Sequence, residues 1–142
     1  MKLLLLLFTS ITLSSFAQQI QDFKVKNDNN AQERTIMLDV MRAQLYQREG
    51  IEMKFVVNHF KSSGEYAWFE GVAQRKDGKP LVLSTDMRDC CQVFALFRKM
   101  NGRWTVAELG AFCTDVCQWG VANRFPNAPK SIFPDDEVYF IE

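Results

Sequence analysis

The chain has 142 residues, and its 17 basic residues balance its 17 acidic ones. A near-neutral chain has no electrostatic basis for binding nucleic acid or an anionic membrane surface, so we expect neither partner. A hydrophobic content of 47% is enough for a true core, which excludes intrinsic disorder as its main character, and the length is that of one domain.

The N-terminus has the pattern of a secretory signal peptide. Lys2 is followed by an apolar run that ends at Leu13, and the small residues Ser15 and Ala17 then fit a cleavage point after Ala17. The run is shorter than the roughly 20 residues that cross a bilayer. We therefore expect residues 1–17 to be removed on export to the bacterial periplasm or the medium, with no stable membrane anchor left behind.

A single long helix is expected near the start of the exported chain. Residues 18–30 are polar and predict a flexible lead-in. Asn30 with Glu33 three residues later matches a capping box, so the helix should begin at Ala31. Gly50 is typical of a left-handed residue that ends a helix. The apolar stripe, which we interpret as core, consists of Ile36, Met37, Val40, Met41 and Leu45.

Two strands should follow, because the apolar period changes to two residues. Residues 51–61 alternate apolar and polar side chains, and residues 65–74 carry bulk on both faces, as an inner strand does. Gly71 indicates a bulge or a close approach of another segment. Residues 81–83 are long enough only for an edge strand.

The strongest hairpin signal is Asn101-Gly102, since both residues tolerate the positive φ that a two-residue type I′ turn requires. The apolar runs on either side predict two paired strands, in which Met100 faces Arg103. Counting outward from the turn places Cys90 opposite Cys113.

Four cysteines in an exported chain are typical of disulfides. The hairpin register predicts a Cys90–Cys113 bond, and Cys91 should pair with Cys117 because successive strand residues point to opposite faces. A bulge would shift the register and exchange the partners, and a bond between the adjacent Cys90 and Cys91 ranks last. Zinc is a less favoured alternative, since adjacent cysteines do not fit the usual ligand spacing. A redox role would need a Cys-x-x-Cys, which is absent.

A short helix over residues 116–125 is expected after the hairpin, capped by Asp115 and ended by Pro126. The segment that follows should return to the core through Ile132 and Phe133.

Together these elements predict one α+β domain over residues 31–134 and an acidic, solvated tail over residues 135–142. Its long N-terminal helix packs on a four-stranded or five-stranded antiparallel sheet, with a short helix near the C-terminus. The element order resembles a cystatin-like roll, and the nuclear-transport-factor-2-like cone is similar in shape. A fold resemblance alone implies no activity.

A second resemblance rests on residues spread over most of the chain after the signal peptide. They are Arg34, Leu38-Asp39, Arg42, Phe55-Val56-Val57, Trp68, Gly102-Arg103-Trp104, Thr114-Asp115-Val116 and Phe133-Pro134. This set is similar to that of a family of small exported bacterial proteins with no assigned function. The motifs are structural in type, so the resemblance implies no activity, and the four cysteines are a local addition to the family pattern.

Residues suited to chemistry are sparse. His59 is the single histidine, has no His or Cys at metal-ligand spacing, and is typical of a partly buried hydrogen-bonding residue. If the fold joins it to Asp115, the two form a base and its orienting partner, and Trp68 is the third pocket candidate. The sequence has no phosphate-binding loop and no nucleophile elbow. We therefore expect no cofactor, no metal and no catalytic residue.

The favoured function is a non-catalytic binding module of the bacterial envelope, with an unknown protein or a small apolar ligand as its partner and an oligomeric state that the sequence leaves open. The alternative is a small-ligand carrier or enzyme with a pocket between helix and sheet. A space filled by Met37, Met41, Phe55 and Leu96 would favour the first, and an open polar cavity with His59 the second. The candidates for a binding face are aromatic, namely Tyr66, Trp68, Trp104 and Trp119.

Overall fold

A five-stranded antiparallel sheet forms the middle layer of the protein, in a computed structural model that describes residues 18–83 and 88–141. The strands are β1 (Ile20–Asp22), β2 (Met53–Ser63), β3 (Tyr66–Arg75), β4 (Gln92–Met100) and β5 (Arg103–Ala111). Each strand pairs with the next, so the sheet is a simple meander. The predicted signal peptide, residues 1–17, lies outside the described residues.

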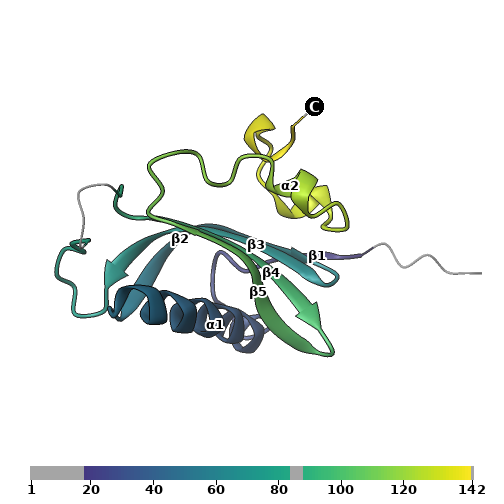
Figure 1. The fold of residues 1–142 in the computed structure, drawn as a ribbon. Coiled ribbons are helices and arrows are strands. Elements are labelled where there is room, and N and C mark those ends of the chain that lie inside the picture. The colour runs from purple at the N-terminus through teal and green to yellow at the C-terminus, as the bar shows by residue number, and fades with distance from the viewer. Residues whose placement is uncertain (1–17, 84–87, 142) are drawn as a thin grey trace, which may run out of the picture.

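Helices cover both faces of this sheet (Figure 1). The long helix α1 (Ala31–Glu49) lies on one face, and the C-terminal segment lies on the other with α2 (Val121–Arg124), η1 (Lys130–Ile132) and η2 (Glu137–Tyr139). The predicted α+β class is confirmed. Within the described part of the chain, no helix has the length and apolar character needed to cross a membrane.

Helix α1 has the predicted bounds, but Asn30, the residue before it, does not cap the helix as the sequence predicts. At its end, Gly50 has a φ of 67° and donates its N–H to the Tyr46 carbonyl, as expected of a left-handed cap. At its start, Asn30 makes no side-chain cap bond. Its amide donates instead to the carbonyls of Asp22 at 3.1 Å and Val25 at 2.9 Å. Asn30 therefore ties the helix to the segment that precedes it.

Buried apolar side chains fill the space between α1 and the sheet. They include Met37, Met41 and Leu45 from the helix and Phe60, Phe69 and Phe97 from the strands. Phe23 is fully buried among them, and its N–H donates to the Phe60 carbonyl at 2.7 Å. The expected lead-in thus belongs to the domain, because β1 pairs with β2 at the edge of the sheet. Residues 81–83, predicted as the edge strand, form no strand.

A bulge in β2 decides which of its side chains face the helix. Val57 pairs with Gly71, and His59 pairs with Glu70, so one residue of β2 lies unpaired between them. A Cβ at Gly71 would lie 2.6 Å from the Val56 carbonyl oxygen. The expectation of a bulge or a close approach at Gly71 is confirmed, and both occur.

The β4–β5 hairpin turns at Asn101-Gly102, as predicted. Farther from the turn, a second bulge shifts the register by one residue. Leu96 pairs with Glu108, where a regular two-residue hairpin would place Ala107. The extra residue is Ala107 of β5, so β4 itself keeps its regular alternation. Phe97 faces the helix, and its neighbour Leu96 therefore packs beneath the C-terminal segment and not in the helix–sheet space where we expected it.

The structure corrects the predicted disulfide pairing of Cys90 with Cys113 and Cys91 with Cys117. Cys113 is bonded to Cys117, with Cα atoms 6.0 Å apart, and Cys90 is bonded to Cys91. The bulge moves the register by one residue, and the last paired residue of β4 is Val93. The β4–β5 pairing therefore ends before it reaches Cys91 or Cys90. Cys90 and Cys91 are therefore not carried to Cys113 by strand pairing.

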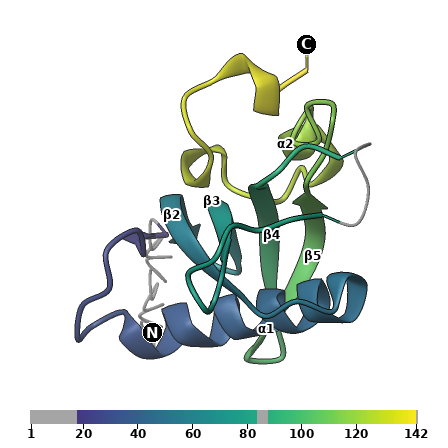
Figure 2. The same ribbon diagram turned by 90° about the vertical axis from the view of Figure 1, so that its left-hand side faces the viewer.

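The C-terminal segment packs on the sheet face opposite α1 (Figure 2). Ile132 and Phe133 are buried there against Trp68, as predicted for the two anchors. Tyr139 is 4% exposed, so part of the segment expected to be a solvated tail belongs to the domain.

The predicted helix over residues 116–125 is reduced to the four residues of α2. Its N-cap is Gly120, with a φ of 61°, and not Asp115. A left-handed glycine at this point starts the helix later than the sequence pattern indicates, because residues 117–120 form turns.

Candidate functional site

The predicted pocket residues His59, Trp68 and Asp115 do not meet in one cavity. His59 Nε2 lies 2.7 Å from the carbonyl oxygen of Ile132, and Trp68 is 1% exposed. Asp115 lies in the exposed loop after β5, where it borders a hollow together with Cys113. His59 and Asp115 thus lie in different surroundings and do not form the predicted pair of a base and its orienting partner.

Glu70 is the polar centre of the interface between the sheet and the C-terminal segment. Its Oε1 accepts hydrogen bonds from Trp68 Nε1 at 2.7 Å and from the Tyr139 hydroxyl. Burial raises the pKa of Tyr139, and its bond to Glu70 raises that pKa further. Tyr139 therefore stays protonated and acts as a donor that ties η2 to β3.

Three of the four aromatic residues predicted as binding-face candidates are buried. Tyr66, Trp68 and Trp104 are 7%, 1% and 6% exposed and pack within the domain. Trp119, in the turn before α2, is 58% exposed. Among the predicted candidates, Trp119 is therefore the one that a ligand can reach.

Trp119 borders a hollow of about 620 Å³ on the C-terminal segment, which we call the Trp119 hollow. Its volume lies within the range of about 300–1,000 Å³ that is typical of small-molecule sites. The other residues that line it are of two kinds, three apolar and three acidic. They are Val138, Phe140 and Ile141, and Asp135, Asp136 and Glu137.

Backbone bonds hold Trp119 beside the C-terminal residues. The N–H of Gly120 donates to the Val138 carbonyl at 2.8 Å. The Asn123 side chain bonds both backbone groups of Ile141, at 2.8 and 2.7 Å. Gly120 has a φ of 61°, and an added Cβ there would collide with the Ile141 side chain. A glycine at this position therefore permits both the turn and the close packing that form the hollow.

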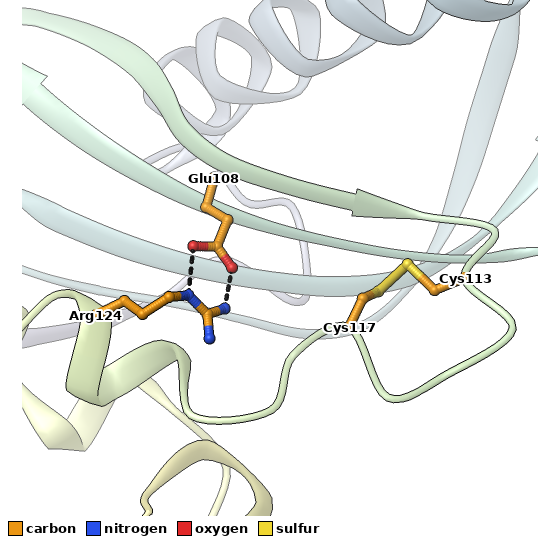
Figure 3. The surroundings of a disulfide bond; sticks show 4 residues. All are labelled: Glu108, Cys113, Cys117 and Arg124. Atoms are coloured by element: carbon orange, nitrogen blue, oxygen red, sulfur yellow. Dashed lines mark hydrogen bonds and ion pairs between the residues drawn. A yellow bond between two sulfur atoms is a disulfide. The ribbon is translucent and has the colours of Figure 1, made fainter.

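Arg124 and a disulfide fix the loop that leads from β5 to the Trp119 hollow (Figure 3). The Arg124 guanidinium donates to both carboxylate oxygens of Glu108, and to the carbonyl of Trp119. Its bonds with Glu108 raise the pKa of Arg124, so the guanidinium stays charged. The Cys113–Cys117 disulfide packs over Gly110, where an added Cβ would lie 2.6 Å from Cys117 Sγ.

A second hollow, of about 480 Å³, lies beside α1 near the start of β2. Four of its five charged side chains form two ion pairs, and Lys54 is the fifth. Arg42 bonds Asp39 at 2.7 Å, and Lys76 lies 3.6 Å from Glu52. Since both carboxylates of this hollow are already paired with a cation, and no exposed tryptophan borders it, it is a weaker candidate than the Trp119 hollow.

The sequence identified Trp119 but not its surroundings. We expected Trp119 on a helix, and Asp135 and Asp136 in a solvated tail. No local pattern relates these residues, because the return of the C-terminal segment brings them together. The available signal was the run of apolar residues at 138–141, since a solvated tail has no reason to carry apolar side chains.

Comparisons with protein-family models, with curated proteins and with solved structures found no match. In the part of the chain that the structure describes, no group of three or more His, Cys, Asp or Glu side chains is placed to hold a metal ion.

Proposed function

We propose that this protein is an exported, non-catalytic binding module that captures its ligand at the Trp119 hollow. The observation that carries the proposal is the exposure of Trp119, which is 58% accessible beside a concave surface while Tyr66, Trp68 and Trp104 are buried. Aromatic side chains give a large contact area at a small cost in conformational entropy. An exposed indole that borders a hollow differs from a single scattered surface hydrophobe.

The titratable groups of the sheet–C-terminal interface have structural roles that support this proposal. Glu70 accepts from Trp68 and Tyr139, and His59 bonds the Ile132 carbonyl. The contacts of Tyr139 with Glu70 and of His59 with Ile132 join the sheet to the C-terminal segment, so the presence of these polar residues is accounted for without a reaction.

Export to the bacterial periplasm or the medium is part of the proposal, and its support is the signal-peptide pattern of residues 1–17. A cystatin-like arrangement is a further part, supported by a meander of five strands with one long helix between β1 and β2. The similarity to small exported bacterial proteins agrees with both. None of these resemblances assigns a ligand.

A ligand screen that follows the tryptophan side chains tests the proposal. Neutral, anionic and cationic small compounds are added to the purified mature protein, and the indole N–H resonances are monitored by NMR. We expect the Trp119 resonance to shift with at least one class, and the resonances of Trp68 and Trp104 to stay in place because both rings are buried.

Three variants separate the competing functions. Trp119→Ala should abolish binding, whereas Tyr46→Ala, which removes a 55% exposed aromatic ring outside the hollow, should bind as the wild type does. A double His59→Ala and Asp115→Ala variant should also bind normally. Binding that is lost in the double variant but kept in Trp119→Ala would favour the alternative carrier or enzyme. If no class of compound shifts the Trp119 resonance, the proposal fails.

A further inference from the structure

We infer that the Trp119 hollow selects small ligands in which a positive charge is attached to an apolar group, such as substituted alkylammonium or benzylammonium compounds. The inference rests on the proposed function of the same hollow and names its ligand class.

The rim of the hollow is acidic and lacks a balancing cation. Asp135, Asp136 and Glu137 line it, and none of its lining residues is basic. Asp136 is fixed at the rim because its Oδ1 accepts the Val138 N–H at 2.9 Å. Asp135 and Glu137 are exposed and form no ion pair with any residue that the structure describes. A ligand cation would therefore find unneutralised carboxylates at the edge of the hollow.

The nearby basic residues on the C-terminal segment are already engaged. Arg124 is held by both carboxylate oxygens of Glu108. Lys130 places its Nζ 5.3 Å from the centroid of the Phe140 ring, which also lines the hollow. This contact shows that one aromatic wall of the hollow accepts an ammonium group on one of its sides. The indole of Trp119 is the stronger cation–π partner, because tryptophan attracts cations better than phenylalanine does.

The apolar residues of the hollow favour an apolar group on the rest of the ligand. Val138, Phe140 and Ile141 line the hollow together with the acidic residues, and Ile141 is 46% exposed. A volume of about 620 Å³ suits a small molecule, so we propose a small cationic ligand. The experiment below distinguishes this ligand from a basic peptide.

A matched series of compounds isolates the effect of charge. Benzyltrimethylammonium, benzyl alcohol and benzoate share one aromatic ring and differ in charge. Titrations followed by the Trp119 indole resonance should show the ammonium compound binding about tenfold more tightly than the alcohol, as cation–π and rim contacts together require. Benzoate should bind more weakly than the alcohol. Added salt should weaken binding of the ammonium compound alone.

Variants of the acidic residues test whether the rim causes the preference for the ammonium compound. A double Asp135→Asn and Glu137→Gln variant should lose most of the preference for the ammonium compound and keep its affinity for benzyl alcohol. The matched control is a double Asp39→Asn and Glu52→Gln variant, which removes the same charge from the hollow beside α1. This control should bind the ammonium compound as the wild type does.

The outcomes are distinct. Equal affinity for benzyl alcohol and the ammonium compound would overturn the charge selectivity and leave the binding-module proposal intact. A lysine-rich peptide that shifts the Trp119 resonance while the small ammonium compound does not would overturn the small-ligand class. A Trp119 resonance that no compound or peptide moves would overturn both proposals.

Discussion

Glu33 has a role that its local sequence pattern does not indicate. The pattern assigns it to a capping box with Asn30, but its Oε1 accepts hydrogen bonds from Lys99 Nζ at 2.6 Å and from Trp104 Nε1 at 2.8 Å. One carboxylate therefore joins the first turn of α1 to the β4–β5 hairpin. A charge-assisted bond across layers competes successfully with a local cap because its donors are held in place by the sheet.

Replacing Glu33 by Gln should lower the free energy of unfolding by about 1 kcal/mol at pH 7, a modest amount because the bridge is partly exposed. Burial acts to raise the pKa of Glu33, but the bonds from Lys99 and Trp104 outweigh it and hold that pKa below its usual value. A carboxyl with a lowered folded pKa stabilises the protein above its unfolded pKa, and this contribution is lost as the pH falls through the folded value. Urea denaturation should therefore show the wild type and the variant converging below about pH 4.

Glu52→Gln is the matched control for this prediction. Glu52 lies 3.6 Å from Lys76, and both side chains are more than two-thirds exposed. Its replacement should change the free energy of unfolding by less than about 0.5 kcal/mol. A Glu33→Gln variant that is as stable as the wild type at pH 7 would show that the bridge contributes nothing.

At the scale of elements, the cysteine pairing depends on where β4 starts. Strand β4 begins at Gln92, so strand pairing does not bring Cys90 or Cys91 to the cysteines after β5. Each disulfide instead joins two cysteines that are close in sequence, Cys90 with Cys91 and Cys113 with Cys117. A tryptic digest without reduction should therefore release residues 89–98 and residues 104–124 as separate peptides, each lighter by two hydrogens than its reduced form. Mass spectrometry that finds these two peptides joined would contradict the pairing and restore a bond between the hairpin strands.

The short helix η2 is held to the sheet by the Tyr139 hydroxyl, which donates to Glu70. Replacing Tyr139 by Phe should cost about 1 kcal/mol at pH 7, since one hydrogen bond is lost and Trp68 still donates to Glu70. Burial and Glu70 raise the pKa of Tyr139, so the folded protein keeps a proton that the unfolded chain loses near pH 10. Wild-type stability should therefore fall as the pH rises above about 10, and the variant should lose this part of the decline.

Tyr46→Phe serves as the control for the alkaline measurement. The Tyr46 ring is 55% exposed on α1 and takes no part in the contact between η2 and the sheet. We expect its unfolding curve at pH 7 to overlay that of the wild type. An alkaline decline that is the same in Tyr139→Phe and in the wild type would exclude Tyr139 as its source.

At the scale of the whole molecule, one sheet serves two cores. The helix-side core contains Met41, and the core beneath the C-terminal segment contains Phe133, whose ring centroid lies 5.3 Å from that of Trp68. Adjacent residues of each strand point to opposite faces, so loss of one core removes support from the other.

The shared sheet predicts a single cooperative unfolding transition. Phe133→Leu should lower the free energy of unfolding by about 1–2 kcal/mol, because a smaller side chain leaves a gap against Trp68. Tryptophan fluorescence and far-ultraviolet circular dichroism should shift to the same lower urea midpoint. Met41→Leu, on the other face, should also move both signals together. If Phe133→Leu shifted the fluorescence transition alone, the C-terminal layer would unfold independently of α1.

The sequence by itself determined the elements whose signals are local. Gly50 ends α1 at the expected residue, and Asn101-Gly102 turns the β4–β5 hairpin, because both features depend on backbone conformations that a few adjacent residues set. The α+β class followed from the change in apolar period. Ile132 and Phe133 were identified as anchors because apolar residues in a proline-containing segment need a core to pack against.

Only the tertiary structure decided the register, the cysteine partners and the candidate site. The bulge between Leu96 and Phe97 adds one residue to β5, and one extra residue is enough to shift the register of every later pair. Trp119 and the acidic rim at residues 135–137 are brought together by the return of the C-terminal segment over the sheet. No local pattern encodes such a meeting, because it is fixed by contacts between residues that are distant in sequence.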